Sequence, residues 1–383
     1  MESEKVIYLD YAANTPVEKE VLDAFSLASV KYIGNPNSTH HLGKIARERI
    51  DIASRNITEN FRNNYNIDEE MELIYTSGAS ESNNLAIKGV AKAYRENGKH
   101  IISTFLEHSS VSAALTNLKE QGYEIDIVDI TEDGKVDLEH LKRLLRNETI
   151  LVSVTAVDGE VGTIQPFNEI AKILKEYENC IFHVDATQAI GKINMNFEDV
   201  DIITFAPHKF YGLNGFGGLF KKKEVVLEPL IHGGTSTSIY RSGTPVVSQI
   251  VAMEKAVELA FQNQDERFEY VNSLNTALRN ELEKYENVKI NTTLLGNPYI
   301  LNLSVMPIKA IDFKEELEKY GVCVSIKSAC TTVISPSRIV MAMTRDKKRA
   351  FSSFRISLSH LVTEDEIKEF LEAFSKCYNI FFS

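Results

Sequence analysis

The amino-acid sequence predicts an α/β fold in which a parallel or mixed sheet is covered by helices on both faces. The middle of the chain alternates short, nearly continuous apolar segments with amphipathic helical patterns, as expected for strands buried on both faces. The chain has 383 residues, of which 43% are hydrophobic, so it can form a large core. The expected strands cover residues 71–76, 100–105, 149–157, 180–186, 200–206 and 216–222, and the expected helices cover residues 81–96, 109–121, 137–146 and 167–178.

A second, smaller α+β lobe is expected after about Val247, where the pattern changes. A long helical pattern with breaks runs to about Tyr285, and strand-like segments and shorter helices follow it. The first fifteen residues are too few to form a lobe alone, so we expect them to pack beside the second lobe. We therefore predict a large domain over residues 16–255 and a small domain over residues 1–15 and 256–383.

Charge and composition argue against several classes of ligand and location. The 42 basic and 54 acidic residues give a net charge of −12, which repels phosphates, so nucleic acid is not expected as the primary ligand. No segment approaches the roughly 18 to 20 apolar residues that cross a bilayer. The first residues are partly acidic and contain no long apolar stretch, so no secretory signal is expected and the cytoplasm is the expected location.

Two segments place polar residues at the ends of predicted strands, where α/β folds bind ligands. Lys209, in TFAPHKFYG, follows an apolar strand and could form an imine with an aldehyde cofactor, although such a lysine can also point outward into solvent. Asp185, in FHVDATQ, could pair with a protonated pyridine nitrogen or cap the next helix. Gln188 could donate a hydrogen bond to the phenolic oxygen of the same ring.

Two further segments indicate an anion site and an imidazole at the same edge. In TSGAS, a strand ends and a helix begins near Ser80, so free N–H groups and the helix dipole could bind a phosphate. Serine is also an ordinary residue at a helix start. His108, in FLEHSS, follows another strand and could stack on a planar ring and move protons, although a single histidine is more often structural.

The four cysteines contain no CxxC pair, so a disulfide framework is not expected. Cys180 and Cys323 lie in apolar strand patterns and are expected to be buried, and Cys377 lies in the last helix. Cys330, in SIKSACTT, lies among small and polar residues, as an accessible nucleophile would, and Lys327 could lower the pKa of its thiol.

The order of the motifs resembles that of the NifS/IscS-type cysteine desulfurases, which are fold type I enzymes of the class V aminotransferase group. The resemblance extends from about residue 6 to residue 375. It implies a pyridoxal-phosphate (PLP)-dependent transferase fold type I, with a mixed, mostly parallel seven-stranded sheet in the large domain. The motifs that carry it are YLDYAANTP, GNPNSTHHLG, TSGASESNNLAIKG, DGEVGTIQP, HVDATQ, HGG, RSGT, SACTT and RISLS, with EH at 107–108 and HK at 208–209.

By this resemblance the chain converts L-cysteine to L-alanine as a homodimer and passes sulfur to a protein acceptor, either a scaffold or a sulfurtransferase. The sulfur would supply iron–sulfur clusters or thiolated cofactors. Three residues would act in catalysis: Lys209 holds PLP, His108 stacks on its ring and Cys330 accepts the sulfur. The other implied contacts are Asp185 and Gln188 with the ring, Ala79, Ser80, His208 and the partner's Thr244 with the phosphate, and Asn35 and Arg355 with the substrate carboxylate. No metal is expected. Arg355 could form a bidentate pair with the substrate carboxylate.

The sequence departs from the family pattern near the expected cofactor. Gly159 replaces an asparagine, and Ala206 and Pro207 replace a serine and a glycine before His208. Lys327 replaces a glycine before the cysteine loop. Each hydrogen bond lost with the asparagine and the serine costs about 1 kcal/mol, so a catalytically weak homologue that acts as a binding or scaffold partner remains one alternative. Another class V PLP enzyme, such as a selenocysteine lyase or an aminotransferase, remains the second. The presence of Cys330 favours a desulfurase, because transamination needs no thiol.

Overall fold

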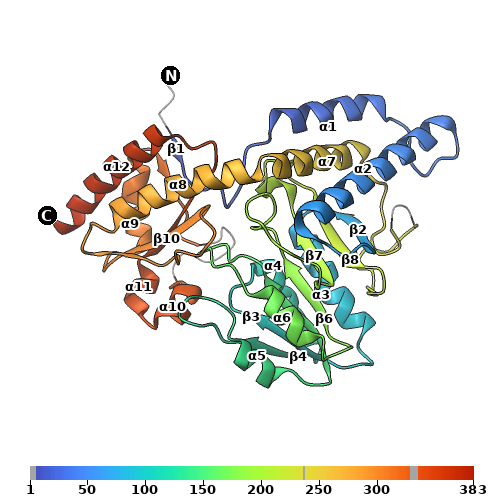
Figure 1. Cartoon of the computed structure of the whole chain (residues 1–383), viewed down its shortest axis with the longest axis horizontal. Coiled ribbons are helices and arrows are strands. Elements are labelled where there is room, and N and C mark those ends of the chain that lie inside the picture. Colours follow the sequence, from blue (N-terminus) through green and yellow to red (C-terminus); the bar gives the residue numbers. More distant parts are fainter. Residues whose placement is uncertain (1–5, 236–237, 328–334) are drawn as a thin grey trace.

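The computed structural model describes residues 6–235, 238–327 and 335–383, and its centre is a seven-stranded sheet (Figure 1). The strand order is β2-β8-β7-β6-β5-β3-β4, and β8 is antiparallel to both of its neighbours whereas the other pairs are parallel. This confirms the predicted α/β fold with a mixed, mostly parallel sheet. The strands are β2 (Met71–Thr76), β3 (His100–Thr104), β4 (Glu124–Val128), β5 (Thr149–Thr155), β6 (Ile181–Asp185), β7 (Ile202–Phe205) and β8 (Gly217–Lys222).

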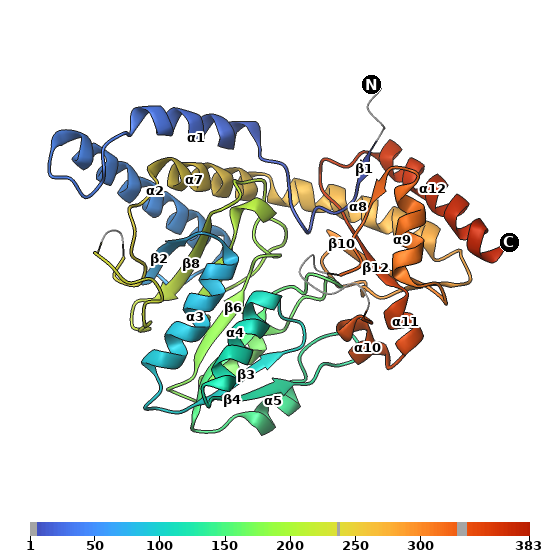
Figure 2. The ribbon, with the colours of Figure 1, turned by 180° about the vertical axis from the view of Figure 1, so that it is seen from behind.

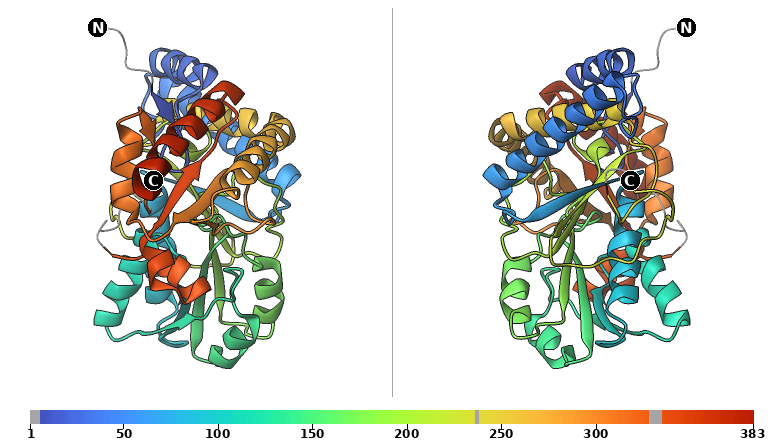
Figure 3. Two further views of the ribbon diagram at one scale, coloured as in Figure 1. Left: turned by 90° about the vertical axis from the view of Figure 1, so that its left-hand side faces the viewer. Right: turned by 90° about the vertical axis from the view of Figure 1, so that its right-hand side faces the viewer.

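Helices cover both faces of this sheet because successive residues of its strands point to opposite sides. In β5, Val152 and Val154 belong to the core under one set of helices, and Leu151 belongs to the core under the other set. Figure 3 shows the two sets on opposite sides of the sheet. One face is covered by α2 (His41–Tyr65), α6 (Phe167–Leu174) and α7 (Val247–Gln262), and the other by α3 (Ala79–Ala93) and α4 (Ser109–Glu120). The large lobe also contains α1 (Lys19–Lys31) and α5 (Leu138–Leu144).

A smaller α+β lobe follows at one end of the molecule (Figure 2). Its antiparallel sheet has the order β12-β10-β9, and β1 pairs in parallel with β11. The N-terminal segment therefore packs beside this lobe, as expected, whereas the predicted domain boundaries stay predictions. Its elements are β1 (Ile7–Tyr8), α8 (Gln264–Leu282), β9 (Val288–Ile290), β10 (Ile300–Val305), α9 (Ala310–Glu318), β11 (Val322–Cys323), α10 (Arg338–Thr344), α11 (Lys347–Phe351), β12 (Ser353–Ser357) and α12 (Glu364–Phe382).

Among the helices in the described ranges, none combines the length and the apolar composition that crossing a bilayer requires.

Candidate active site

The carboxyl ends of the parallel strands meet at one edge of the sheet and open into a cavity of about 730 Å³. This is the position at which open α/β sheets bind ligands. The segments after β2, β3, β5, β6 and β7 all line it, together with residues from both ends of the chain. Most of the predicted site residues therefore share one cavity: Ala79, Ser80, His108, Asp185, Gln188, His208, Lys209 and Arg355.

Lys209 lies at the end of a short 3-10 turn, Pro207–Lys209, directly after β7. Its Nζ donates hydrogen bonds to the carbonyl oxygens of Ala12 at 2.9 Å and Ala13 at 2.6 Å. Both acceptors belong to the N-terminal segment that borders the cavity. The side chain thus points inward, so the alternative of an outward-pointing surface lysine is wrong.

Asp185 is the last residue of β6 and is only 4% exposed. Its Oδ2 accepts a hydrogen bond from Asn83 Nδ2 at 2.8 Å, and its Oδ1 accepts one from the Thr187 N–H at 3.0 Å. Asn83 is fixed in turn because its Oδ1 accepts from Thr204 Oγ1. These neutral donors hold the carboxylate in one orientation at the cavity wall and leave its charge available to a cationic group of a ligand.

His108 is the N-cap of α4, and its Nδ1 accepts a hydrogen bond from the Ser110 N–H at 3.1 Å. The neutral ring therefore carries its proton on Nε2. Desolvation lowers the pKa of His108, the charge of Lys209 lowers it further and Asp185 opposes the shift. The ring is thus neutral at pH 7. His108 caps a helix and lines the cavity at the same time, so its structural role does not exclude a functional one.

The start of α3 forms a recess for an anion. Gly78 precedes the helix with a φ of 152°, and the first helical hydrogen bond runs from the Ser82 N–H to its carbonyl. The N–H groups of Ala79, Ser80 and Glu81 precede that bond, so they have no carbonyl acceptor within the helix. All three residues line the cavity. The helix dipole adds to these donors, so the recess suits a phosphate.

His208 lies beside Lys209 and shares its surroundings. Burial and the charges of Lys209 and Lys192 lower the pKa of His208 to about 4, so its ring is neutral at pH 7 and can act as a hydrogen-bond donor without adding charge. Ala206, which stands where the family has a serine, is completely buried. It supplies no hydroxyl group to the cavity.

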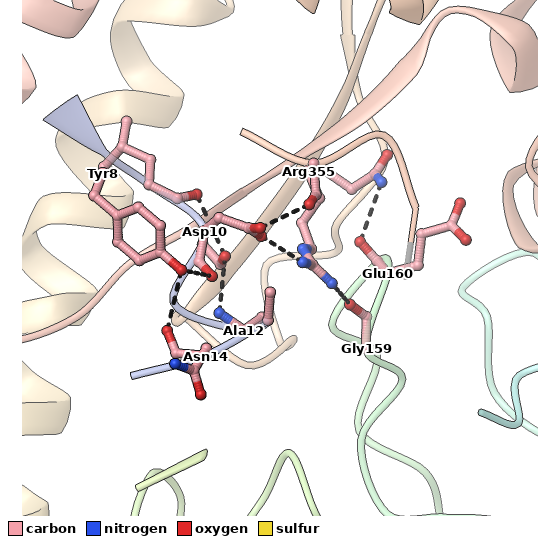
Figure 4. A network of polar contacts seen from close by, with 12 residues as sticks. Tyr8, Asp10, Ala12, Asn14, Gly159, Glu160 and Arg355 are labelled. Carbon is pink, nitrogen blue, oxygen red and sulfur yellow. Dashed lines mark hydrogen bonds and ion pairs between the residues drawn. The ribbon is translucent and has the colours of Figure 1, made fainter. Parts of the chain in front are cut away.

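Arg355 lies in β12 of the small lobe and is 2% exposed. Figure 4 shows its guanidinium between Asp10, whose Oδ1 lies 2.6 Å from Nη2, and the Gly159 carbonyl oxygen, 2.6 Å from Nη1. Its Nε is buried and makes no hydrogen bond with the residues that the structure describes. The sequence did not identify Asp10 as a partner of this arginine. A substrate carboxylate would have to share the guanidinium with Asp10, so its binding here stays a prediction.

Gly159 leaves space beside Gln188. A Cβ atom built on Gly159 would lie 3.7 Å from Gln188 Cγ, which is an ordinary van der Waals contact, so the backbone can carry a side chain here. Its neighbour Asp158 is buried, and its carboxylate accepts hydrogen bonds from the Glu160 and Gly162 N–H groups, each at 3.2 Å. Burial raises the pKa of Asp158 to about 6.

Two predicted residues do not line the cavity. Asn35 lies in the exposed loop between α1 and α2, where its Oδ1 accepts from the Asn37 N–H at 2.9 Å. Thr244 lines a separate recess of about 110 Å³ near the carboxyl end of β2. Neither residue reaches the site of its own chain, and their predicted contacts remain predictions.

Three of the four cysteines lie in the part of the chain that the structure describes. Cys330 lies outside the described residues, so its predicted role is untested. Cys180 and Cys377 are buried, whereas Cys323 is only partly buried because β11 pairs with a single strand, so the expectation for Cys323 is wrong. Lys327 Nζ donates to Ser335 Oγ at 3.0 Å, and its effect on the thiol of Cys330 stays a prediction.

Two titratable residues in or beside the cavity received no role from the sequence, although Glu107 belongs to the EH motif. Glu107 directly precedes His108 and lines the cavity, and one of its carboxylate oxygens is buried with no partner among the described residues. Lys192 is 5% exposed and donates to Gln188 Oε1 at 2.8 Å. A charged residue inside the apolar stretch AIGKI was a signal that could have identified Lys192. In the described part of the chain, no group of three or more His, Cys, Asp or Glu side chains is placed to hold a metal ion.

Comparisons with known proteins agree with this architecture. Residues 7–370 match the family model described as aminotransferase class-V, so the chain belongs to the class-V aminotransferase family. A protein of Dictyoglomus turgidum named cysteine desulfurase IscS is 36% identical, with 97% of this chain and 94% of that protein covered. The protein of the same name from Glaesserella parasuis is 37% identical, with 97% and 92% covered.

Solved structures give the same result. A structure titled NifS-like protein superposes with a TM-score of 0.89 at 32% identity and covers 98% of this chain and 99% of its own. A NifS-like protein from Rickettsia africae superposes with a TM-score of 0.86 at 29% identity, with 98% and 100% covered. The predicted resemblance and fold type are thereby confirmed.

Proposed function

We propose that this chain is a PLP-dependent cysteine desulfurase, which converts L-cysteine to L-alanine and transfers the sulfur to Cys330 as a persulfide. The observation that carries the proposal is the convergence of Lys209 and Asp185 in one cavity. It occurs in a chain that matches proteins named cysteine desulfurase IscS over 97% of its length. An amine and a buried carboxylate at this edge of the sheet are the two groups that PLP chemistry requires of the protein.

The donors and acceptors of the cavity fit PLP. The N–H groups at the start of α3 suit its phosphate, Asp185 suits its protonated pyridine nitrogen, and Gln188 Nε2 carries a second hydrogen for the ring oxygen. Lys209 supplies the amine that binds the aldehyde. When bound, PLP acts as an electron sink for bonds at the α-carbon of an amino acid. His108 lines the same cavity with a neutral ring that can lie against the cofactor.

The sulfur step requires a thiolate, which we assign to Cys330. Its sulfur forms a bond with the sulfur of the substrate while the substrate's C–S bond breaks. The electron pair of that bond remains with the carbon, which then takes a proton to give alanine. Cys330 is left as a persulfide, and a protein acceptor removes its outer sulfur. Arg355 would hold the substrate carboxylate during this transfer, since its guanidinium borders the cavity.

We further propose that the enzyme is a cytoplasmic homodimer that feeds iron–sulfur clusters or thiolated cofactors. Thr244 lies outside the cavity of its own chain, which suits a contact with the phosphate in a second copy. The absence of an amide side chain at Gly159 is the observation that favours a catalytically weak homologue instead.

Borohydride trapping tests the assignment of Lys209. Protein supplied with PLP should be yellow, and a peptide map after reduction should find the cofactor on Lys209.

A Cys330→Ala variant tests the assignment of the sulfur acceptor. It should keep the colour and its spectral response to L-cysteine but form no persulfide. Cys180→Ala is the matched control and should still form persulfide. Cofactor on another lysine, or persulfide on the Cys330→Ala protein, would contradict the proposal.

A further inference from the structure

Lys192 is a buried cation without an acidic neighbour in the described structure. It lies in the turn region after β6 and is 5% exposed. Its Nζ donates to Gln188 Oε1 at 2.8 Å, and the described residues give it no ion pair. A buried ammonium is normally paired with a carboxylate. Its retention beside the cavity therefore calls for a role other than an ion pair.

A chain of hydrogen bonds connects Lys192 to Lys209. Gln188 accepts from Lys192 through Oε1 and donates through Nε2 to the Ala12 carbonyl oxygen at 2.9 Å. The same carbonyl oxygen accepts from Lys209 Nζ at 2.9 Å. An ammonium only donates and a carbonyl only accepts, so these two groups leave Gln188 a single amide orientation. Lys192 thus directs Nε2, with its second hydrogen, toward the side of the cavity where Lys209 lies.

In the described structure, the charged groups that act electrostatically on Lys192 are basic. They are Lys209, after β7, and Arg355, in β12, and the charge of Lys192 acts in turn on His208. Burial, followed by the charges of Lys209 and Arg355, lowers the pKa of Lys192 to about 7. The ammonium is therefore charged in mildly acidic solution and largely neutral in mildly alkaline solution. Because charges of like sign oppose each other's protonation, its charge must in turn act on Lys209.

We propose that Lys192 is a positioning residue that fixes the Gln188 amide and whose positive charge weakens proton binding at the nitrogen of Lys209. The inference rests on the proposed function, because that nitrogen is the one to which PLP would bind. Through its charge, Lys192 would thus control whether the nitrogen that joins Lys209 to PLP is protonated. Lys192 itself touches neither substrate nor cofactor in this account.

The pH dependence of the visible band of the PLP-loaded protein tests the inference. In Lys192→Met, which removes the charge and keeps the length of the side chain, the midpoint of this titration should rise by on the order of one pH unit. Lys221→Met is the matched control, because Lys221 is buried like Lys192 but pairs with Glu72 at 2.9 Å on the edge pair β2–β8, outside the cavity lining. Its midpoint should equal that of the wild type. An unchanged midpoint in Lys192→Met would overturn the inference.

A second measurement does not require the cofactor. Competitive labelling of the cofactor-free protein with acetic anhydride reports, by peptide mapping, the pH at which Lys209 becomes reactive. That pH should rise in Lys192→Met. If this variant does not fold, Lys192→Gln replaces it and should show the same rise. Lys221→Met should leave the pH unchanged. Equal labelling curves would overturn the inference. Failure of the wild type to bind PLP would instead overturn the proposed function, and the labelling result would still decide the role of Lys192.

Discussion

Among the described residues, the hydrogen bonds to Glu107 all reach one oxygen of its carboxylate. Its Oε1 accepts hydrogen bonds from Thr104 Oγ1 at 2.7 Å and from the Thr155 N–H at 2.9 Å, whereas its Oε2 is buried and has no partner in the described part of the chain. Burial raises the pKa of Glu107 to about 8, and the charges of Asp185 and Asp158 add to the shift. The folded protein therefore holds a neutral carboxylic acid beside the cavity at pH 7.

Because Glu107 is protonated in the fold, we expect the cofactor-free Glu107→Gln variant to be more stable than the wild type by an amount that depends on pH. An unfolded glutamate titrates near 4.3, so the protonated acid stabilises the fold fully below that pH, and this contribution is lost as the pH rises to about 8. Glutamine is uncharged throughout, and its Oε1 can keep both hydrogen bonds. The variant should become more stable than the wild type, with a difference that grows between pH 5 and 8 to roughly 1 to 3 kcal/mol.

Urea denaturation at pH 5, 7 and 9 measures this difference. Glu132→Gln, at an exposed position in a turn, is the control and should show a difference that is small and constant. A difference for Glu107→Gln that stays constant or shrinks with rising pH would show that the acid is ionised in the folded protein.

The position of three predicted residues at the cavity could be predicted, because each follows a strand within a short, continuous segment. Lys209, Asp185 and His108 were identified in this way, and the structure places them in one cavity. The pairing of Asp10 with Arg355 could not be predicted, because 345 residues separate the two partners and only the packing of the N-terminal segment beside β12 brings them together. Long-range polar contacts of this kind leave no local pattern in the sequence.

At the scale of elements, the buried strands were the predictable part of the fold. All six expected strands of the main sheet occur within two residues of the expected limits. Strand β4 was missed because it lies at the edge of the sheet, where Glu124 and Asp126 interrupt its apolar residues. Helix α2 was also missed, although Ala46, Ile50, Ala53, Ile57 and Phe61 recur along its buried face.

The last helix offers a test of local stabilisation. Thr363 caps α12, because its Oγ1 accepts from the Glu366 N–H at 3.2 Å while the Glu366 side chain accepts from the Thr363 N–H at 2.8 Å. Thr363→Ala should lower the free energy of unfolding by about 1 kcal/mol. In Thr276→Ala, the hydroxyl lost is exposed and donates to the Asn272 carbonyl oxygen within α8, so the loss should be near zero. Equal losses in thermal unfolding of the two variants would refute the role of the cap.

At the scale of the whole molecule, both lobes contribute to the site. The large lobe supplies Lys209 and Asp185, whereas the small lobe supplies Arg355 and the N-terminal segment supplies Ala12 and Asp10. Helices α7 and α8, separated at Asn263, run from one lobe to the other (Figure 1). Substrate chemistry at this junction therefore depends on the relative position of the lobes as well as on the strand ends.

The formation of alanine from L-cysteine tests the central claim most directly. PLP-loaded protein should form alanine and sulfide in equal amounts when a dithiol is present to reduce the persulfide. Lys209→Ala and Cys330→Ala should each abolish both products, the first for lack of bound cofactor and the second for lack of a sulfur acceptor. Wild-type protein that carries PLP on Lys209 and forms no alanine, or Cys330→Ala protein that forms alanine at the wild-type rate, would contradict the account.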